Sequence, residues 1–157
     1  MKRFAVFGSP INQSLSPQIH EAFAAQFGMA LKYERMLTEQ GELKSALAAF
    51  QKMDGKGANI TSPLKHEAFT LCQHLSLSAQ KAKAVNTIGW NEQGELWGDN
   101  TDGEGLVKDL RHNQHLMLTN KRILLLGAGG VASSSTPAQR GSHVLCASPD
   151  RHQQDRR

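Results

Sequence analysis

The stretch Gly57-Ala-Asn-Ile-Thr-Ser-Pro-Leu-Lys65 predicts a junction between a strand and a helix. Ala58 to Thr61 is typical of a short buried strand. Ser62-Pro63 is typical of a helix start, because serine can cap free backbone N–H groups and proline needs no donor at the first helical position. An apolar stripe at helical spacing follows, made of Leu64, Ala68, Leu71, Cys72 and Leu75. Because α/β proteins bind ligands where strand ends meet helix starts, we expect the chemistry of the chain at this junction.

Lys65 is the charged residue of this junction, and it falls in the first turn of the predicted helix. A cation at that positive end of the helix dipole is disfavoured by about 0.3–1 kcal/mol. A local rule that is broken without visible compensation is typical of functional sites. The alternative is a solvated surface lysine, which is the common situation for this residue type.

Strand and helix patterns alternate on both sides of the junction. Before it, the sequence predicts strands at residues 4–7 and 31–37 and helices at residues 16–27 and 39–52. After it, the sequence predicts a short helix, a hairpin and a further helix, at residues 78–84, 86–97 and 106–111. This succession predicts an α/β fold with a mixed, largely parallel sheet and flanking helices.

Two serines lie between the first predicted strand and the first predicted helix. Ser16-Pro17 is a second serine–proline helix start, and the helix that follows carries an apolar stripe and a stop at Gly28, the stripe being Ile19, Ala22, Phe23 and Phe27. Ser14 and Ser16 then lie in a loop whose hydroxyls and free backbone N–H groups suit a carboxylate ligand. The alternative is that Ser16 only caps the helix.

The composition argues against several classes of function. The chain has 157 residues, 39% hydrophobic residues and a net charge of +4, which is enough apolar material for a core. No basic run with interleaved aromatics indicates nucleic-acid binding, and no apolar run is long enough for a signal peptide or a membrane span. Cys72 and Cys146 are isolated, which suits a reducing cytoplasm. His112 and His115 lie in a polar stretch, so we expect no metal site.

A glycine-rich run follows the last strand predicted with a clear pattern. Residues 121–126 are typical of a buried strand, and Gly127-Ala-Gly-Gly-Val-Ala132 follows at once. Glycine or alanine at positions 127, 129 and 132 matches a dinucleotide-binding loop, where small residues allow the tight turn, the approach of a pyrophosphate and helix packing. Residues 133–137, Ser-Ser-Ser-Thr-Pro, disfavour the helix that should come next.

Five motifs occur in a fixed order between residues 4 and 132. They are Gly8-x-Pro10-Ile11 with Ser14-Leu15-Ser16-Pro17, Asn59-Ile-Thr61-x-Pro63-x-Lys65, Ala84-Val85-Asn86-Thr87, Gly98-Asp99-Asn100-Thr101-Asp102-Gly103 and Gly127-Ala128-Gly129-Gly130. In these motifs the chain resembles the shikimate dehydrogenase family. Any one motif could arise by chance, whereas the ordered set is highly specific.

The resemblance implies the reversible NADPH-dependent reduction of 3-dehydroshikimate to shikimate, on the way to aromatic amino acids. It implies a substrate domain and a Rossmann-type NADP domain with the active site between them. Lys65 would give the proton in reduction and take it in oxidation, with Asp102 beside it. The remaining implied roles are the substrate carboxylate on Ser14 and Ser16, ring hydroxyls on Thr61, Asn86 and Asp102, pocket lining by Asn59, and NADP contacts by Gly127, Ala128, Gly129, Gly130 and Val131.

The resemblance ends after Ala132. We assign residues 1–102 to a shikimate-binding catalytic domain, 103–132 to the first strand and glycine loop of a truncated Rossmann domain, and 133–157 to a tail outside the family pattern. Residues 144–147 are compatible with a short strand. We expect a poorly ordered tail, produced by a frameshift or a comparable break in the gene, and a chain with little or no dehydrogenase activity.

Other functions stay open from the sequence alone. A quinate/shikimate dehydrogenase that uses NAD is the alternative within the same class of enzyme, and a non-catalytic shikimate-binding remnant is the alternative outside it. A homodimer is a further expectation. Nucleic-acid and membrane partners are not expected.

Overall fold

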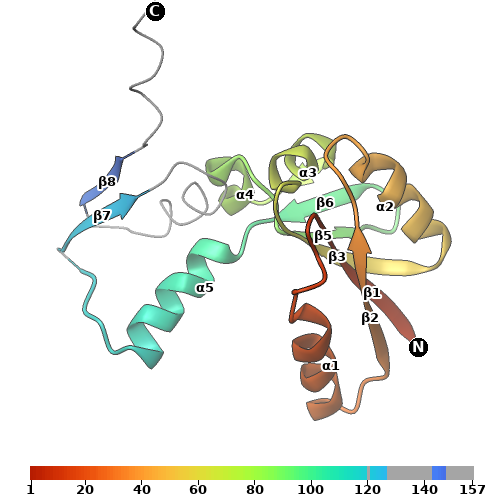
Figure 1. Ribbon diagram of the computed structural model, residues 1–157, viewed down its shortest axis with the longest axis horizontal. Helices are drawn as coiled ribbons and strands as arrows, with labels where there is room; N and C mark the ends of the chain where they lie inside the picture. Colours follow the sequence, from red (N-terminus) through yellow and green to blue (C-terminus); the bar gives the residue numbers. More distant parts are fainter. Residues whose placement is uncertain (120, 127–142, 148–157) are drawn as a thin grey trace, which may run out of the picture.

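A six-stranded sheet forms the centre of the N-terminal part of the chain in the computed structural model, which describes residues 1–119, 121–126 and 143–147 (Figure 1). Its strands are β1 (Lys2–Gly8), β2 (Leu31–Leu37), β3 (Gly55–Ile60), β4 (His74–Leu75), β5 (Thr87–Trp90) and β6 (Leu96–Asp99). The order across the sheet is β2-β1-β3-β5-β6-β4. β1 pairs in parallel with β2 and β3, β4 pairs in parallel with β6, and β5 is antiparallel to both neighbours. The expected mixed, largely parallel α/β sheet is confirmed.

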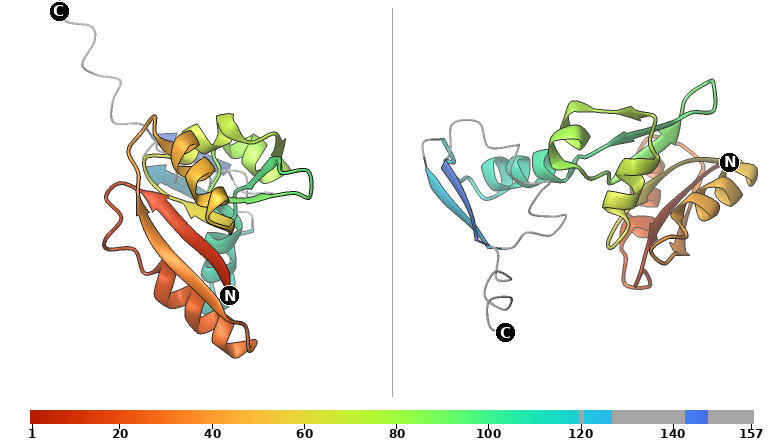
Figure 2. Two further views of the ribbon diagram at one scale, coloured as in Figure 1. Left: turned by 90° about the vertical axis from the view of Figure 1, so that its right-hand side faces the viewer. Right: turned by 90° about the horizontal axis from the view of Figure 1, so that it is seen from above.

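Helices lie against both faces of this sheet (Figure 2). α2 (Leu43–Lys52), α3 (Lys65–Leu71) and α4 (Leu77–Ala82) all contribute buried residues to one core cluster with Ala5 and Phe7 of β1. Side chains alternate across a strand, so Phe4 and Val6 face the opposite side. There they pack with Tyr33, next to α1 (Ser16–Gln26).

The apolar stripe of α2 and the first part of the stripe predicted for α3 build the main core. The predicted stripe is too long, because α3 ends at Leu71, Cys72 is extended and Leu75 lies on β4. Leu43, Leu47 and Phe50 are buried along α2, and Leu64 and Ala68 are fully buried at α3. The ring of Phe50 meets that of Phe7 edge to face, with the centroids 5.6 Å apart. This packing fixes α3, and with it Lys65, against the ends of β1 and β3.

The predicted serine–proline helix starts are wrong in detail. α3 begins at Lys65 rather than Ser62, and its N-cap position is Leu64, which makes no side-chain cap. The peptide before Pro63 is cis, Leu64 N donates to Thr61 O, and Ser62 O accepts from Ser9 N across the molecule. These backbone hydrogen bonds hold residues 61–64 in a turn, so the contact with the end of β1 overrides the local capping preference.

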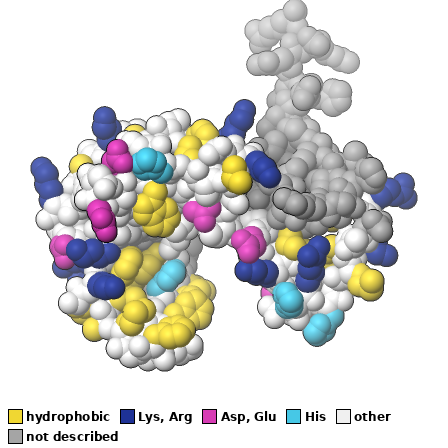
Figure 3. Space-filling model, turned by 180° about the vertical axis from the view of Figure 1, so that it is seen from behind, with side chains coloured by type: hydrophobic (Ala, Val, Ile, Leu, Met, Phe, Trp, Pro, Cys, Tyr) yellow, Lys and Arg dark blue, Asp and Glu magenta, His cyan; other side chains and the backbone are white. Residues whose placement is uncertain are grey.

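The apolar stripe of α1 does not enter the core. Pro17 and Ala24 are the buried residues of this helix, whereas Ile19, Phe23 and Phe27 are 46%, 54% and 75% exposed. In the space-filling view from behind, hydrophobic side chains gather at the lower left, over α1 and the neighbouring face of the sheet (Figure 3). An apolar hollow of about 470 Å³ opens there, with Phe4 and Trp97 in its wall.

The chain leaves the six-stranded sheet through α5 (Asp102–Lys108), which continues as the π-helical turn η1 (Asp109–Asn113). Beyond it, β7 (Arg122–Leu126) and β8 (His143–Ala147) form a separate two-stranded parallel sheet, which Figures 1 and 2 show apart from the larger one. The short strand with which residues 144–147 are compatible is present as β8. β7 is not fully buried, since Leu124 is 62% exposed.

Several sequence predictions lie outside the described residues. The glycine run at 127–132 is among them, and so is the tail at 133–142 and 148–157. Residues 143–147 form a strand instead of the poorly ordered chain expected of the whole tail. Among the described residues, no helix combines the length and the apolar character needed to cross a membrane.

Candidate active site

One polar cavity of about 410 Å³ lies where the ends of β1 and β3 meet the starts of α1, α3 and α5. This volume is typical of small-molecule sites. Every residue that the sequence analysis proposed for substrate contact lines it, namely Ser14, Ser16, Asn59, Thr61, Lys65, Asn86 and Asp102. The fold therefore brings together side chains from segments that are far apart in the sequence.

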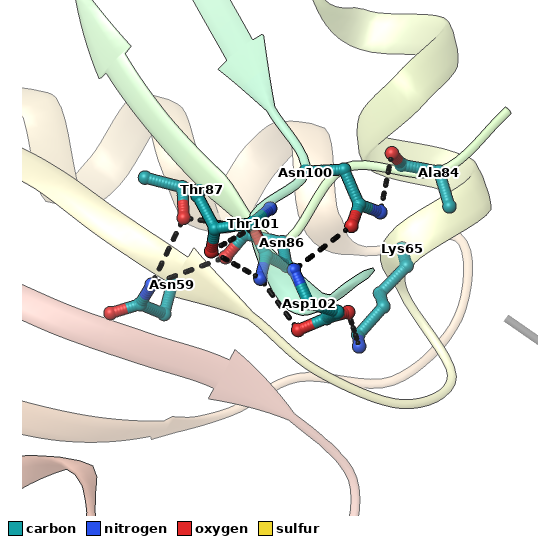
Figure 4. Close-up of polar contacts among 8 residues, drawn as sticks. All are labelled: Asn59, Lys65, Ala84, Asn86, Thr87, Asn100, Thr101 and Asp102. Carbon is teal, nitrogen blue, oxygen red and sulfur yellow. Dashed lines mark hydrogen bonds and ion pairs between the residues drawn. The ribbon is translucent and has the colours of Figure 1, made fainter. Parts of the chain in front are cut away.

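Lys65 is not a solvated surface lysine. Its side chain is only 12% exposed, and its Nζ lies 2.6 Å from Asp102 Oδ2 (Figure 4). Asp102 is in the first turn of α5, where a carboxylate is favoured by the helix dipole, whereas the N-cap position is Thr101. The carboxylate thus serves as the partner of Lys65 rather than as a cap, and it supplies the compensation that the cation at the start of α3 requires.

Asn86 connects this ion pair to the sheet. Its Nδ2 donates to Asp102 Oδ1 at 2.6 Å, and its Oδ1 accepts from Thr101 N at 3.1 Å and from Thr87 Oγ1 at 2.9 Å (Figure 4). Asn86 is only 8% exposed, so its polar atoms need these partners. Asn86 thus orients the Asp102 carboxylate through Oδ1, while Oδ2 of the same carboxylate binds Lys65.

Asn100 fixes the loop that carries Asp102, a role that its motif does not predict. Its Nδ2 donates to Ala84 O at 2.9 Å, and its Oδ1 accepts from Asp102 N at 3.2 Å (Figure 4). Asn100 is 4% exposed. The available signal was the density of polar turn formers at 98–103, which shows that a turn forms but not which side chain holds it.

The serine loop is held by its backbone, and Ser16 does not cap α1. Leu15 occupies the N-cap position without a side-chain cap. Ser14 Oγ donates to Ser16 Oγ at 3.1 Å, so the Ser16 hydroxyl hydrogen can be given to a ligand. Arg35 of β2 donates to Ser14 O from Nε at 2.9 Å and from Nη2 at 2.6 Å. The capping alternative for Ser16 is therefore ruled out.

Gly8 allows the two sides of the cavity to approach. A Cβ at this position would lie 2.4 Å from Thr61 Cγ2 and 2.9 Å from Ser62 O. Backbone atoms cannot give way as a flexible side chain can, so any other residue would push the end of β1 away from the end of β3. The glycine of the first motif thus has a packing reason.

His20 is a lining residue that the sequence analysis did not propose. It follows Ser16 by four positions, which places the two on one face of α1, and this spacing was the signal that could have found it. Burial lowers the pKa of the His20 imidazole, which favours its neutral form. No group of three or more potential metal-ligating side chains occurs in the part of the chain that the structure describes.

The cavity thus combines a partly buried ammonium–carboxylate pair with hydroxyl and amide groups from several separate segments. Such a site suits a small polyhydroxylated acid, with the ammonium able to exchange a proton with a ligand oxygen. Residues 6–88 match the family described as the shikimate dehydrogenase substrate binding domain, which is more than half of the chain. The chain belongs to the shikimate dehydrogenase family.

Members of the shikimate dehydrogenase family are similar to this chain in both sequence and structure. Shikimate dehydrogenase (NADP(+)) from Nitrosococcus oceani is 53% identical over 146 residues, which are 91% of this chain and 52% of that protein. Shikimate 5-dehydrogenase from Thermus thermophilus, solved in complex with shikimate, superposes with a TM-score of 0.85 at 35% identity, covering 93% of this chain and 56% of that one.

A second structure of the Thermus thermophilus enzyme, in complex with NADP(H) and shikimate, gives the same TM-score of 0.85 and covers 93% of this chain and 55% of that one. The chain spans about half the length of the curated relatives it matches. The proposed NADP contacts Gly127, Ala128, Gly129, Gly130 and Val131 lie outside the described residues. The domain boundaries at 102 and 132 stay predictions.

Proposed function

We propose that the polar cavity binds shikimate and 3-dehydroshikimate, and that it is the substrate site of their NADPH-dependent interconversion. The observation that carries this proposal is the Lys65–Asp102 pair, which is largely buried within a cavity that also contains the two serines. The relatives are named shikimate dehydrogenase (NADP(+)), and similar structures were solved in complex with shikimate.

The roles that the family resemblance implies are compatible with the chemistry of each side chain. Ser14 and Ser16 bind the substrate carboxylate, with the Ser16 hydroxyl as the donor and the Ser14 hydroxyl holding it in place. Thr61, Asn86 and Asp102 hydrogen-bond the ring hydroxyls, and Asn59 completes the same wall. This division places the acid group of the substrate at the serine loop and its reacting carbon near Lys65.

Lys65 acts as the general acid in reduction. When the ketone carbon receives hydride, negative charge builds on the oxygen, and an ammonium beside it both stabilises that charge and supplies the proton. In the reverse direction the neutral amine takes the proton from the hydroxyl. Asp102 holds the Lys65 side chain in place by its Oδ2, and Asn86 holds Asp102 by its Oδ1.

NADPH, when bound, supplies the hydride. We assign its binding to the glycine run at 127–131, which lies between β7 and β8 in the sequence, and we favour NADP over NAD because the relatives are named for NADP(+). We further propose a cytoplasmic location, which the isolated cysteines suit. For a polypeptide of this sequence alone we propose shikimate binding with little turnover, because it spans about half of the relatives' length.

Calorimetric titration of the chain with shikimate, quinate and NADPH tests this proposal. We expect shikimate to bind, and Lys65→Met to raise its Kd by about 10- to 100-fold, since hydrogen bonds to charged groups contribute about 1.5–3 kcal/mol. Lys81→Met is the matched control, because Lys81 is an exposed lysine of α4 that does not line the cavity. A chain that releases no heat with shikimate contradicts the proposal, and turnover equal to that of a full-length relative contradicts the low-activity part.

A further inference from the structure

The orientation of the Asn59 amide is determined by the protein itself. Asn59 Nδ2 lies 3.3 Å from the backbone oxygen of Asn86 and 3.3 Å from Thr87 Oγ1 (Figure 4). A backbone carbonyl oxygen only accepts hydrogen bonds, so the atom that faces it must be the amide nitrogen. The other amide atom, Oδ1, accepts the hydroxyl hydrogen of Tyr33 at 2.5 Å.

Tyr33 reaches Asn59 from behind the cavity wall. It lies on the edge strand β2 and is 6% exposed. The described residues that line the polar cavity do not include Tyr33. Its ring stacks on the imidazole of His20, with the centroids 4.5 Å apart and the planes at 8°. Burial raises the pKa of the Tyr33 hydroxyl, which keeps it protonated and able to donate at neutral pH.

We propose that Tyr33 is a positioning residue for the substrate: its hydroxyl holds the Asn59 amide with the oxygen available to a ring hydroxyl of shikimate, and His20 holds the Tyr33 ring in place. An amide oxygen has two lone pairs. Tyr33 donates to one of them, and the second, which the His20 imidazole also reaches, is the one that the ligand takes. The two amide hydrogens are occupied by Asn86 and Thr87, so Asn59 serves the ligand as an acceptor. This inference rests on the proposed function of the cavity.

Tyr33→Phe tests the inference, because it removes one oxygen and keeps the ring that stacks on His20. We expect its Kd for shikimate to rise about 3- to 10-fold, which corresponds to one neutral hydrogen bond. Asn59→Ala should weaken binding by itself, and Tyr33→Phe added to it should change the Kd by less than about twofold, because Tyr33 then has no amide to orient. A residue with a merely structural role would weaken binding equally in both backgrounds.

The side-chain amide signals of Asn59 in ¹H–¹⁵N spectra give a readout that needs no ligand, and they should shift or broaden in Tyr33→Phe. Thr38→Val is the matched control, since it removes another buried hydroxyl just after β2, where Thr38 bonds to Met36 O and does not line the cavity. Unchanged Asn59 signals together with an unchanged Kd in Tyr33→Phe overturn the inference while the proposed function stands. If the unaltered chain does not bind shikimate, both the inference and the proposed function are wrong.

Discussion

Lys65 shows how the surroundings of one residue decide its behaviour. At the start of α3 the helix dipole disfavours its charge, yet the Asp102 carboxylate lies 2.6 Å away and the side chain is 12% exposed. Asp102 lies 37 positions further along the chain, so no local pattern pairs the two. The pair exists because β5, β6 and the loop before α5 return the chain to the end of β3.

Arg35 is a residue whose contribution is visible only through its partner. Both of its hydrogen bonds to Ser14 O come from outside the cavity, and a third goes to Gln18 Oε1 at 3.1 Å. We expect Arg35→Gln to raise the Kd for shikimate by about 3- to 10-fold. The reason is that Ser14 O loses the two hydrogen bonds that the Arg35 guanidinium donates, so the serine loop becomes less ordered. Titration calorimetry measures this change.

The control for Arg35 is Arg3→Gln, which removes an arginine from the neighbouring strand. Arg3 forms a partly exposed surface ion pair with Glu34 at 3.4 Å and does not line the cavity. We expect its Kd to stay within about twofold of the unaltered chain, since exposed ion pairs contribute little. Equal losses in both variants would mean that Arg35 acts through general stability or net charge.

At the scale of elements, α3 stabilises the start of α2. The Glu67 carboxylate accepts Gly41 N at 2.8 Å and Leu43 N at 3.2 Å, and these are backbone donors at the N-terminus of α2. The N-cap residue of α2, Glu42, makes no side-chain cap of its own. The Glu67 carboxylate of α3 thus replaces the missing cap of α2. Its negative charge also interacts favourably with the positive end of the α2 dipole.

Glu67→Ala is expected to lower the free energy of unfolding by about 1–2 kcal/mol, the usual effect of losing a helix cap. Urea denaturation followed by circular dichroism measures it. Glu92→Ala, in the exposed turn between β5 and β6, should change the free energy by less than about 0.5 kcal/mol. A Glu67→Ala variant as stable as Glu92→Ala would show that the N-terminus of α2 is satisfied by water instead.

At the scale of the whole molecule, the two faces of the six-stranded sheet differ. The face under α2, α3 and α4 is covered, while α1 covers the other only in part and leaves the hollow near Phe4 and Trp97 (Figure 3). Exposed apolar patches of this kind promote association between proteins. This surface is the physical reason to expect a homodimer or a larger assembly of the chain.

We therefore expect the chain to self-associate as its concentration rises, as measured by sedimentation velocity. The double substitution Phe23→Gln and Phe27→Gln should shift the distribution toward the monomer without loss of helix signal, because both side chains are more than half exposed. Leu106→Gln, at a 41% exposed leucine of α5, is the control and should leave the distribution unchanged. A chain that is monomeric at every concentration contradicts this expectation.

The sequence by itself located most of the elements and the proposed substrate contacts, but not His20 of the cavity. Apolar runs and periodicity located β1, β2 and α2, because burial of an apolar stripe is the dominant local requirement for a helix or strand. The turn residues at 91–94 located the hairpin of β5 and β6. The motifs named every proposed substrate contact that the cavity brings together. Apolar patterns and motifs extend over a few consecutive residues, so they can be recognised without knowledge of the tertiary structure.

The tertiary structure alone decided how those groups are held. It set the start of α3 through the hydrogen bond from Ser9 N to Ser62 O, and it paired Lys65 with Asp102. It also placed Tyr33, Arg35 and Asn100 behind the cavity wall. It also left the stripe of α1 exposed, although its pattern is that of a buried helix. The physical reason is that hydrogen bonds and burial between distant segments depend on where the chain returns, which no local pattern specifies.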